Sequence, residues 1–97
     1  MAIQSFKKGL VEEFFLRGKL KKEVGWAPIR DIVKRKLDMM EYAAKLIDLR
    51  SPPANRLEAL KGDKDGFYSI CINDQWRIVF RWTPVGPSNV SIENYHS

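Results

Sequence analysis

The sequence contains few of the residues from which disulfides and metal centres are built. Its 97 residues include one cysteine, Cys71, and one histidine, His96. A single cysteine cannot form an intramolecular disulfide, and one cysteine with one histidine cannot complete a tetrahedral zinc site. We therefore expect a protein without a disulfide, a metal centre or a bound cofactor.

Long apolar stretches are also missing from the sequence. No run approaches the roughly 20 residues that a helix needs to cross a bilayer, and the opening MAIQSFKKGL lacks the apolar block of a signal peptide. We find no phosphate-binding loop, GxGxxG, HExxH or nucleophile elbow. We expect a cytoplasmic protein that does not bind membranes, and its site must be inferred from residue spacing.

The composition that remains is that of a folded, basic domain. Hydrophobic residues make up 44% of the sequence and charged residues 30%, a balance typical of globular rather than disordered chains. The length predicts a single domain spanning 1–97. The net charge is +5, which suits a nucleic-acid partner but is equally compatible with an acidic protein partner.

The N-terminal half has the apolar spacing of two amphipathic helices. In the first, the apolar positions are Phe6, Leu10, Val11, Phe14 and Phe15. We expect this helix to begin near Ser5 as N-cap and to stop at Gly18, with Ile3 in a possible short strand before it. The second helix should start near Pro28 and continue towards Ala44, with a basic outer face. That face carries Arg30, Lys34, Arg35 and Lys36.

The C-terminal half changes to the period of β-strands. The segments GFYSICI, QWRIVFRW and NVSIENY predict three strands in a meander, and RLEALKG could add another. In the middle strand, Trp76, Ile78, Phe80 and Trp82 share the core face, and Arg77, Val79 and Arg81 share the other. The fold class is therefore α+β, with both helices on one face of a small, mainly antiparallel sheet.

The free face of this sheet is the candidate site. Arg77 and Arg81 are four residues apart on one strand, about 13 Å at roughly 3.3 Å per residue, a separation on the scale of phosphate contacts. A hairpin can bring Tyr95 and His96 beside them, and histidine suits proton transfer near neutral pH. The alternatives are solvated surface arginines and a histidine in a loose tail.

A carboxylate and a cation precede the sheet. Glu58 and Lys61 are three residues apart in RLEALKGD, just before the first predicted strand. They could serve the same site as Arg77, or they could form a local salt bridge that contributes little to stability. Spacing alone leaves both interpretations open.

Several long blocks of the chain resemble one family, the HigB toxins of bacterial toxin–antitoxin systems, within the RelE/ParE superfamily. The blocks are SFKKGLVEEFF, LRSPPANRLE, LKGD, INDQWRI and the terminal IENYHS. They follow one another in the family's order and cover most of the sequence. The resemblance therefore extends over the helices, the connector and the strands.

The resemblance implies a ribosome-dependent mRNA endonuclease that cleaves translated mRNA in the 30S decoding site and needs no metal. In such enzymes the 2′-hydroxyl attacks the adjacent phosphate and the 5′-oxygen leaves. Lys61 and Arg77 would hold the phosphate, and His96 and Tyr95 would transfer protons or orient the nucleotide. The expected contacts to RNA and the ribosome are Arg81, Lys34, Arg35 and Arg56. The implied partner is a HigA-type helix-turn-helix antitoxin, through which operator DNA is contacted only indirectly.

Two positions depart from the family's pattern. Some relatives have a histidine where Glu58 stands and an aspartate where Asn94 stands. Glutamate can act as a general base but is a poor acid at neutral pH, and asparagine can hydrogen-bond but cannot exchange a proton. Glu58 and Asn94 therefore stand at positions that are catalytic in the family but carry different residues here. The mechanism would then depend more on His96 and Glu58 as a pair, and the activity could be weaker.

Two other functions fit the same resemblance. ParE-like members of the superfamily bind and inhibit DNA gyrase without cleaving RNA, and a catalytically weak copy could act only with its antitoxin in operon repression. A gyrase inhibitor has no need for His96 together with Arg77 and Lys61, whereas a nuclease does. The residues of the site therefore favour cleavage.

Overall fold

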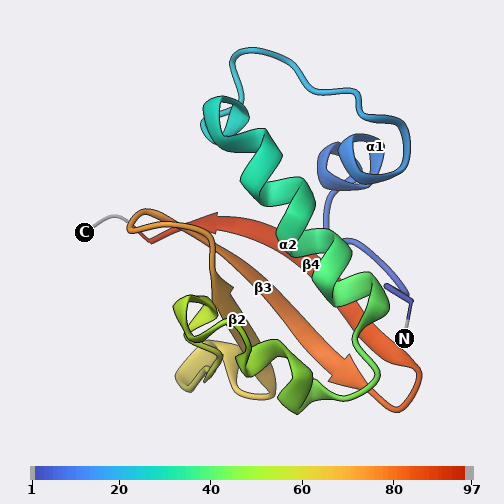
Figure 1. The fold of residues 1–97 in the computed structure, drawn as a ribbon, viewed down its shortest axis with the longest axis vertical. Coiled ribbons are helices and arrows are strands. Elements are labelled where there is room, and N and C mark those ends of the chain that lie inside the picture. Colours follow the sequence, from blue (N-terminus) through green and yellow to red (C-terminus); the bar gives the residue numbers. More distant parts are fainter. Residues whose placement is uncertain (1, 96–97) are drawn as a thin grey trace.

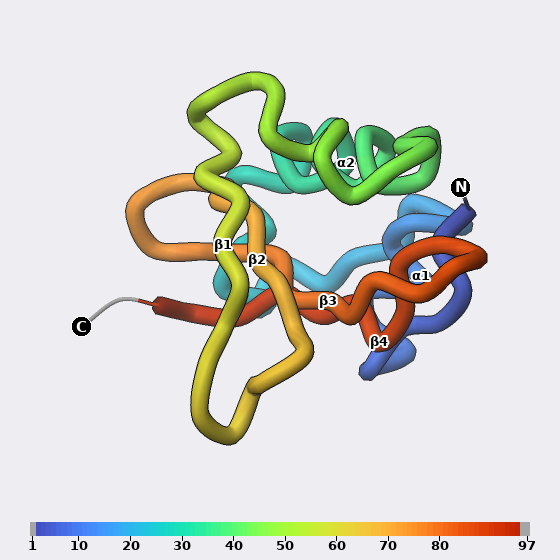
Figure 2. Tube along the Cα trace, turned by 90° about the horizontal axis from the view of Figure 1, so that it is seen from below, coloured from blue at the N-terminus to red at the C-terminus, as the bar shows by residue number. Residues whose placement is uncertain are grey.

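The computed structural model describes residues 2–95 and confirms an α+β fold with helices on one face of an antiparallel sheet (Figure 1). The elements are α1 (Gly9–Arg17), α2 (Arg30–Tyr42), β1 (Glu58–Ala59), β2 (Phe67–Cys71), β3 (Trp76–Thr83) and β4 (Gly86–Asn94). Short 3-10 helices occupy Ala27–Ile29 (η1), Leu46–Arg50 (η2), Pro53–Asn55 (η3) and Gly62–Lys64 (η4). The strand order is β1-β2-β3-β4, so the sheet is a meander. Figure 2 shows α2 along one side of β3 and β4.

The first helix begins later than the sequence predicts. It starts at Gly9 rather than near Ser5, because residues 4–7 lie alongside β4 and hydrogen-bond to it. The Val90 N–H donates to the Ser5 carbonyl over 3.1 Å, and the Ser5 Oγ accepts a hydrogen bond from the Asn89 N–H over 2.9 Å. The prediction that Ser5 caps the helix was therefore wrong, since its hydroxyl is already used by the strand.

The predicted end of the first helix is confirmed. Gly18 has a φ of +71°, and its N–H donates to the Phe14 carbonyl over 2.8 Å. This left-handed conformation favours glycine, which has no Cβ to clash. Ile3 does not lie in a named strand, but its N–H donates to the Glu41 carboxylate over 2.9 Å, which ties the N-terminal segment to α2.

The second helix has one buried face, as predicted, but its basic face is not entirely exposed. Pro28 lies in η1, directly before α2, and Val33, Leu37 and Met40 are fully buried. Lys36, which the helical spacing placed on the outer face, is only 7% exposed. The prediction failed because the segment that follows the helix folds back to it, and the buried Asn55 of that segment accepts a hydrogen bond from the Lys36 Nζ.

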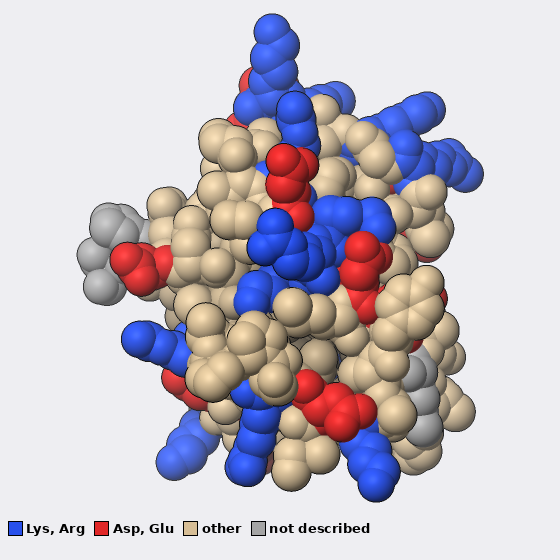
Figure 3. Space-filling view, viewed as in Figure 1, with Lys and Arg blue, Asp and Glu red and all other residues tan. Residues whose placement is uncertain are grey.

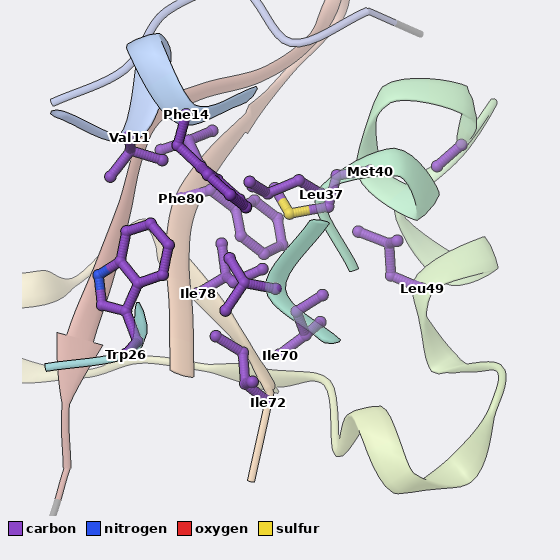
Figure 4. Close-up of a cluster of buried hydrophobic side chains, with 13 residues drawn as sticks. Val11, Phe14, Trp26, Leu37, Met40, Leu49, Ile70, Ile72, Ile78 and Phe80 are labelled. Atoms are coloured by element: carbon purple, nitrogen blue, oxygen red, sulfur yellow. The ribbon is translucent and has the colours of Figure 1, made fainter. Parts of the chain in front are cut away.

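Apolar side chains from both layers form one core between the helices and the sheet (Figure 4). Phe80, Ile78 and Ile70 come from the strands and meet Leu37 on α2, all with no exposed surface. Phe14 and Trp26 make an edge-on contact with their ring centres 5.1 Å apart. The contact fixes α1 against the loop that leads into α2.

The alternation predicted for β3 holds on its core face and fails at one residue on the other face. Ile78 and Phe80 are fully buried, as expected, but Val79 is also only 1% exposed. A register shift between Val79 and Arg81 interrupts the pairing with β4, and the neighbours of Val79 across the sheet, Ser69 and Ser91, are buried too. The middle of the second face is therefore covered rather than open.

The described part of the chain has neither a membrane-spanning helix nor a cluster of metal ligands. Its helices between residues 2 and 95 are too short or too polar to span a bilayer. In the same range, no group of three or more His, Cys, Asp and Glu side chains is arranged to hold a metal ion.

Candidate functional site

Arg77 is held in one orientation on the sheet face that the helices do not cover. It lies on β3, next to the buried Ile78, and only 12% of its side chain is exposed. Its Nε donates to the Ser69 Oγ over 2.8 Å, and its Nη2 donates to the Arg56 carbonyl over 2.8 Å. Because two hydrogen bonds fix the guanidinium plane, its remaining N–H groups form a preorganised donor set for an anion.

The connector before the sheet builds one side of this arrangement. Arg56 has a φ of +46°, a left-handed conformation that follows η3. The preceding Asn55 is fully buried and donates to the Leu49 and Ser51 carbonyls over 3.0 and 3.3 Å. The Nζ of Lys36 on α2 donates to the Asn55 Oδ1, so α2 is linked by buried hydrogen bonds to the residue before Arg56.

Burial lowers the pKa of the Lys36 ammonium below its ordinary value. The nearby Cys71 thiol opposes this shift, and the charge of Arg35 adds to it. A buried ammonium is costly unless it has a hydrogen-bond acceptor, and Asn55 supplies one. The pair is therefore a structural support behind the site.

Tyr95 lies beside Arg77, as the hairpin argument predicts. The Arg77 Cζ is 5.8 Å from the centre of the Tyr95 ring, and the ring is partly exposed. The two residues line a pocket of about 250 Å³. The other lining residues are Arg56, Cys71, Asn73 and Asp74. His96, the predicted companion of Tyr95, lies outside the described residues.

Glu58 is a carboxylate within reach of Arg77. It lies on β1 opposite Ser69, and its Oε1 is 3.9 Å from the Arg77 Nη2. Its side chain is 57% exposed, and an ion pair so exposed contributes only about 0–1 kcal/mol. An incoming anion can therefore replace this contact at little cost, and the carboxylate can turn to a neighbouring hydroxyl.

Two predicted site residues do not line the pocket of Arg77 and Tyr95. Lys61 is exposed at the N-terminal boundary of η4, beyond β1, and is not among the described residues that line this pocket. Asn94 is paired with Trp76 in the β3–β4 register, whereas Glu93 is paired with Arg77. Because successive residues of a strand face opposite sides, the register assigns Asn94 to the other face of the sheet.

Glu93 is a residue that sequence reasoning missed. It faces Arg77 across the β3–β4 pair, where its carboxylate accepts a hydrogen bond from the Ser91 Oγ over 2.7 Å and lies 3.9 Å from the Lys7 Nζ. The signal was present, because period two along β4 puts Glu93 on the same face as Tyr95. A second carboxylate thus borders the site.

The other predicted basic contacts fall into two groups. Arg81 shares the face of Arg77, is exposed, and has its Cζ 5.1 Å from the Phe67 ring centre. Lys34 and Arg35 are on α2 in the helical layer, and Lys34 is paired with Asp38 over 2.7 Å. Figure 3, which faces that layer, shows lysines and arginines interspersed with acidic side chains. The helix cations therefore cannot reach an anion that is bound at Arg77.

The arrangement defines a class of protein: a small α+β domain with an arginine-centred anion site, bordered by carboxylates and a tyrosine, on the sheet face that the helices do not cover. A family model described as the RelE-like toxin of type II toxin–antitoxin system HigB matches residues 4–96. The chain therefore belongs to the HigB-like toxin family, as the sequence blocks predicted. Membership makes it a type II toxin and implies an antitoxin partner.

Two curated relatives with HigB names agree with the family assignment. Toxin HigB-1 of Vibrio cholerae serotype O1 is 37% identical over 82 residues, which cover 84% of each chain. Endoribonuclease HigB of Proteus vulgaris is 27% identical over 96 residues, covering 97% of this chain and 99% of the relative. An uncharacterized protein of Haemophilus influenzae is 43% identical over 51 residues, about half of each chain.

Proposed function

We propose that this toxin is a ribosome-dependent endoribonuclease that cleaves translated mRNA and so inhibits protein synthesis. The observation that carries the proposal is the fixed guanidinium of Arg77, which lines a pocket with Tyr95 and lies 3.9 Å from the Glu58 carboxylate. A full-length relative named an endoribonuclease supports the same reaction.

Arg77 binds the phosphate that is cleaved. The 2′-hydroxyl of the preceding nucleotide loses its proton and its oxygen attacks phosphorus, while the bond to the 5′-oxygen breaks and that oxygen gains a proton. The products are a 2′,3′-cyclic phosphate and a free 5′-hydroxyl. Negative charge grows on the non-bridging oxygens along this path, and a preoriented guanidinium stabilises it more than water can.

Acid–base roles are assigned by position. Glu58 accepts the proton of the 2′-hydroxyl, since an ionised carboxylate is a base and its exposed side chain can turn from Arg77 to the nucleotide. Tyr95 orients the nucleotide beside Arg77, and His96 donates the proton to the leaving 5′-oxygen. Lys61, exposed beyond β1, supplies a second cation to the RNA backbone next to this phosphate, whereas Asn94, on the other face of the sheet, does not contact it.

The ribosome supplies the substrate in a defined geometry. The 30S decoding site holds the mRNA, and Arg81, Lys34, Arg35 and Arg56 contact RNA phosphates around it. Such contacts displace counterions, so docking weakens as salt rises. The partner that neutralises this activity is a HigA-type helix-turn-helix antitoxin in the cytoplasm, and operator DNA is bound through the antitoxin.

Cleavage on programmed ribosomes tests the proposal. The wild-type protein should produce new 5′ ends within translated codons, Arg77→Ala should abolish them, and Arg30→Ala, a surface arginine outside the site, should not. Intact mRNA accompanied by a DNA-damage response on induction would instead identify a gyrase inhibitor. Equal cleavage by wild type and Arg77→Ala would remove Arg77 from the reaction.

A further inference from the structure

A groove runs along α1 on the side of the molecule that carries the helices. It encloses about 770 Å³, within the roughly 300–1,000 Å³ of ligand pockets. Its lining residues are Leu10, Glu13, Gly18, Lys19, Leu20 and Lys21. None of these residues was assigned to the candidate site.

The groove follows from how the helix ends. Gly18 ends the helix in its left-handed conformation, and residues 18–21 line the groove together with Leu10 and Glu13 of α1. Figure 1 shows the loop then crossing over to the start of α2. Leu20 packs against the core from this loop, while Leu10 remains 42% exposed on the helix. Two leucines therefore form an apolar floor that is open to water.

The rim of the groove is positively charged. Lys19 and Lys21 are both exposed, and within residues 2–95 neither takes part in an ion pair. The carboxylate of Glu13, which also lines the groove, is already paired with Arg17 over 3.1 Å. The two loop lysines are thus available to carboxylates on an incoming molecule.

We propose that this groove docks an acidic amphipathic segment of the antitoxin. The proposal rests on membership of the toxin family, which implies such a partner, and does not require RNA cleavage. Apolar side chains of that segment cover Leu10 and Leu20, and its acidic residues pair with Lys19 and Lys21. Protein–protein interfaces commonly have this arrangement, with an apolar centre and a charged rim.

The other occupants fit the groove less well. RNA binds through cations and through stacking on aromatic rings, and the groove is floored by leucines, which offer bases no ring. A second copy of the chain in a two-fold dimer would place the same lysines on both sides of the interface, where they repel. An acidic amphipathic segment can contact the leucine floor with its apolar side chains and the lysine rim with its carboxylates.

The groove is separate from the anion site. α1 packs in the helical layer, whereas Arg77 projects from the opposite face of the sheet. Substitutions in the groove can therefore change antitoxin binding and leave the residues around Arg77 in place.

Binding of the purified cognate antitoxin to full-length toxin variants tests the proposal. Leu10→Ser should raise the dissociation rate and weaken affinity by roughly tenfold, since it removes apolar contact area. Leu16→Ser is the matched control, because Leu16 is 63% exposed on the same helix but does not line the groove. The double variant Lys19→Glu/Lys21→Glu should slow association most at low salt.

A second charge variant, Arg30→Glu/Arg50→Glu, changes the net charge by the same amount away from the groove. The proposal predicts that it binds the antitoxin like the wild type at matched salt.

Equal losses of antitoxin affinity in both charge variants, or unchanged antitoxin binding by Leu10→Ser, would overturn the proposal. So would a groove variant that loses ribosome binding but keeps antitoxin affinity, or a toxin dimer that Leu10→Ser dissociates. Because the readout is binding, a toxin that cleaves no RNA could still pass the test.

Discussion

The main-chain carbonyl of Arg56 accepts a hydrogen bond from the Arg77 Nη2 over 2.8 Å, across 21 residues of sequence. A loop residue in a left-handed conformation thereby sets the plane of a guanidinium on the middle of the sheet. The consequence for chemistry is that the cation is oriented before any substrate arrives, so little reorganisation is needed at the moment of reaction.

Replacing Arg77 with lysine should show how much this orientation matters. Lysine keeps the positive charge but lacks the planar guanidinium group, so it cannot reproduce the paired hydrogen bonds to the Ser69 hydroxyl and the Arg56 carbonyl. We expect cleavage on programmed ribosomes to fall by about 10²-fold or more, the typical effect of removing one stabilising donor. Single-turnover rates measure it, and Arg30→Lys serves as control. A rate within a few-fold of wild type would show that charge alone is sufficient.

Glu58→Gln tests the proposed base. The amide keeps the size of the side chain but cannot accept the proton of the 2′-hydroxyl, so the cleavage rate should fall by about 10²-fold, within the usual range for general-base catalysis. Glu12→Gln on the exposed side of α1 is the matched control. Cleavage at the wild-type rate would assign the base to another group, and Glu93 would be the next residue to change.

Arg81→Gln should affect binding rather than chemistry. If Arg81 contacts one RNA phosphate, its loss should weaken RNA or ribosome binding and reduce the slope of log affinity against log salt by about 0.7–0.9. The measurement is affinity at several salt concentrations. An unchanged slope would place Arg81 outside the RNA interface and leave it as surface charge stacked on Phe67.

Lys36→Met should destabilise the fold although it adds an apolar residue to a buried position. It leaves the Oδ1 of the fully buried Asn55 without its Lys36 donor, and an unsatisfied buried group costs about 1–3 kcal/mol. Lys34→Met, on the same helix but with a half-exposed partner, should cost at most about 1 kcal/mol. Urea unfolding measures the free energy of unfolding of both variants. Equal losses in the two variants would show that the hydrogen bond from Lys36 to Asn55 does not stabilise the fold.

The same variant isolates a pH dependence. The folded state lowers the pKa of Lys36 below its ordinary 10.5, so between the lowered value and 10.5 the unfolded chain binds more protons than the folded one. The free energy of unfolding that Lys36 contributes should therefore rise with pH in this window. The difference in unfolding free energy between wild type and Lys36→Met should increase as pH approaches 10.5, and a constant or falling difference would contradict this.

Sequence reasoning succeeded where structure is periodic. The helical spacing of Val33, Leu37 and Met40 and the alternation of Ile78 and Phe80 each follow from local geometry, and all of these residues are fully buried. The strand period and the expected hairpin also predicted that Tyr95 lies beside Arg77, and the structure has the two side chains in contact.

The failures share one physical cause, which is contact between distant segments. Ser5 has the chemistry of a helix cap but is engaged by β4, and Lys36 fits a solvated helix face but is covered by the chain after the helix. The hydrogen bond from Arg77 to the Arg56 carbonyl depends on the conformation of a loop, for which no spacing in the sequence is diagnostic. Glu93 was missed for the same reason, because only the strand register shows that it is the β4 residue paired with Arg77.

The pairing of residues 4–7 with β4 should affect the tendency of the protein to aggregate. Hydrogen bonds from this segment to Pro87 and Val90 occupy the outer side of β4, and β1 at the opposite end of the sheet is only two residues long. Long unpaired strand edges are where sheets of different molecules join and aggregate. A toxin separated from its antitoxin is thus protected from assembling into fibrils through its longest strand.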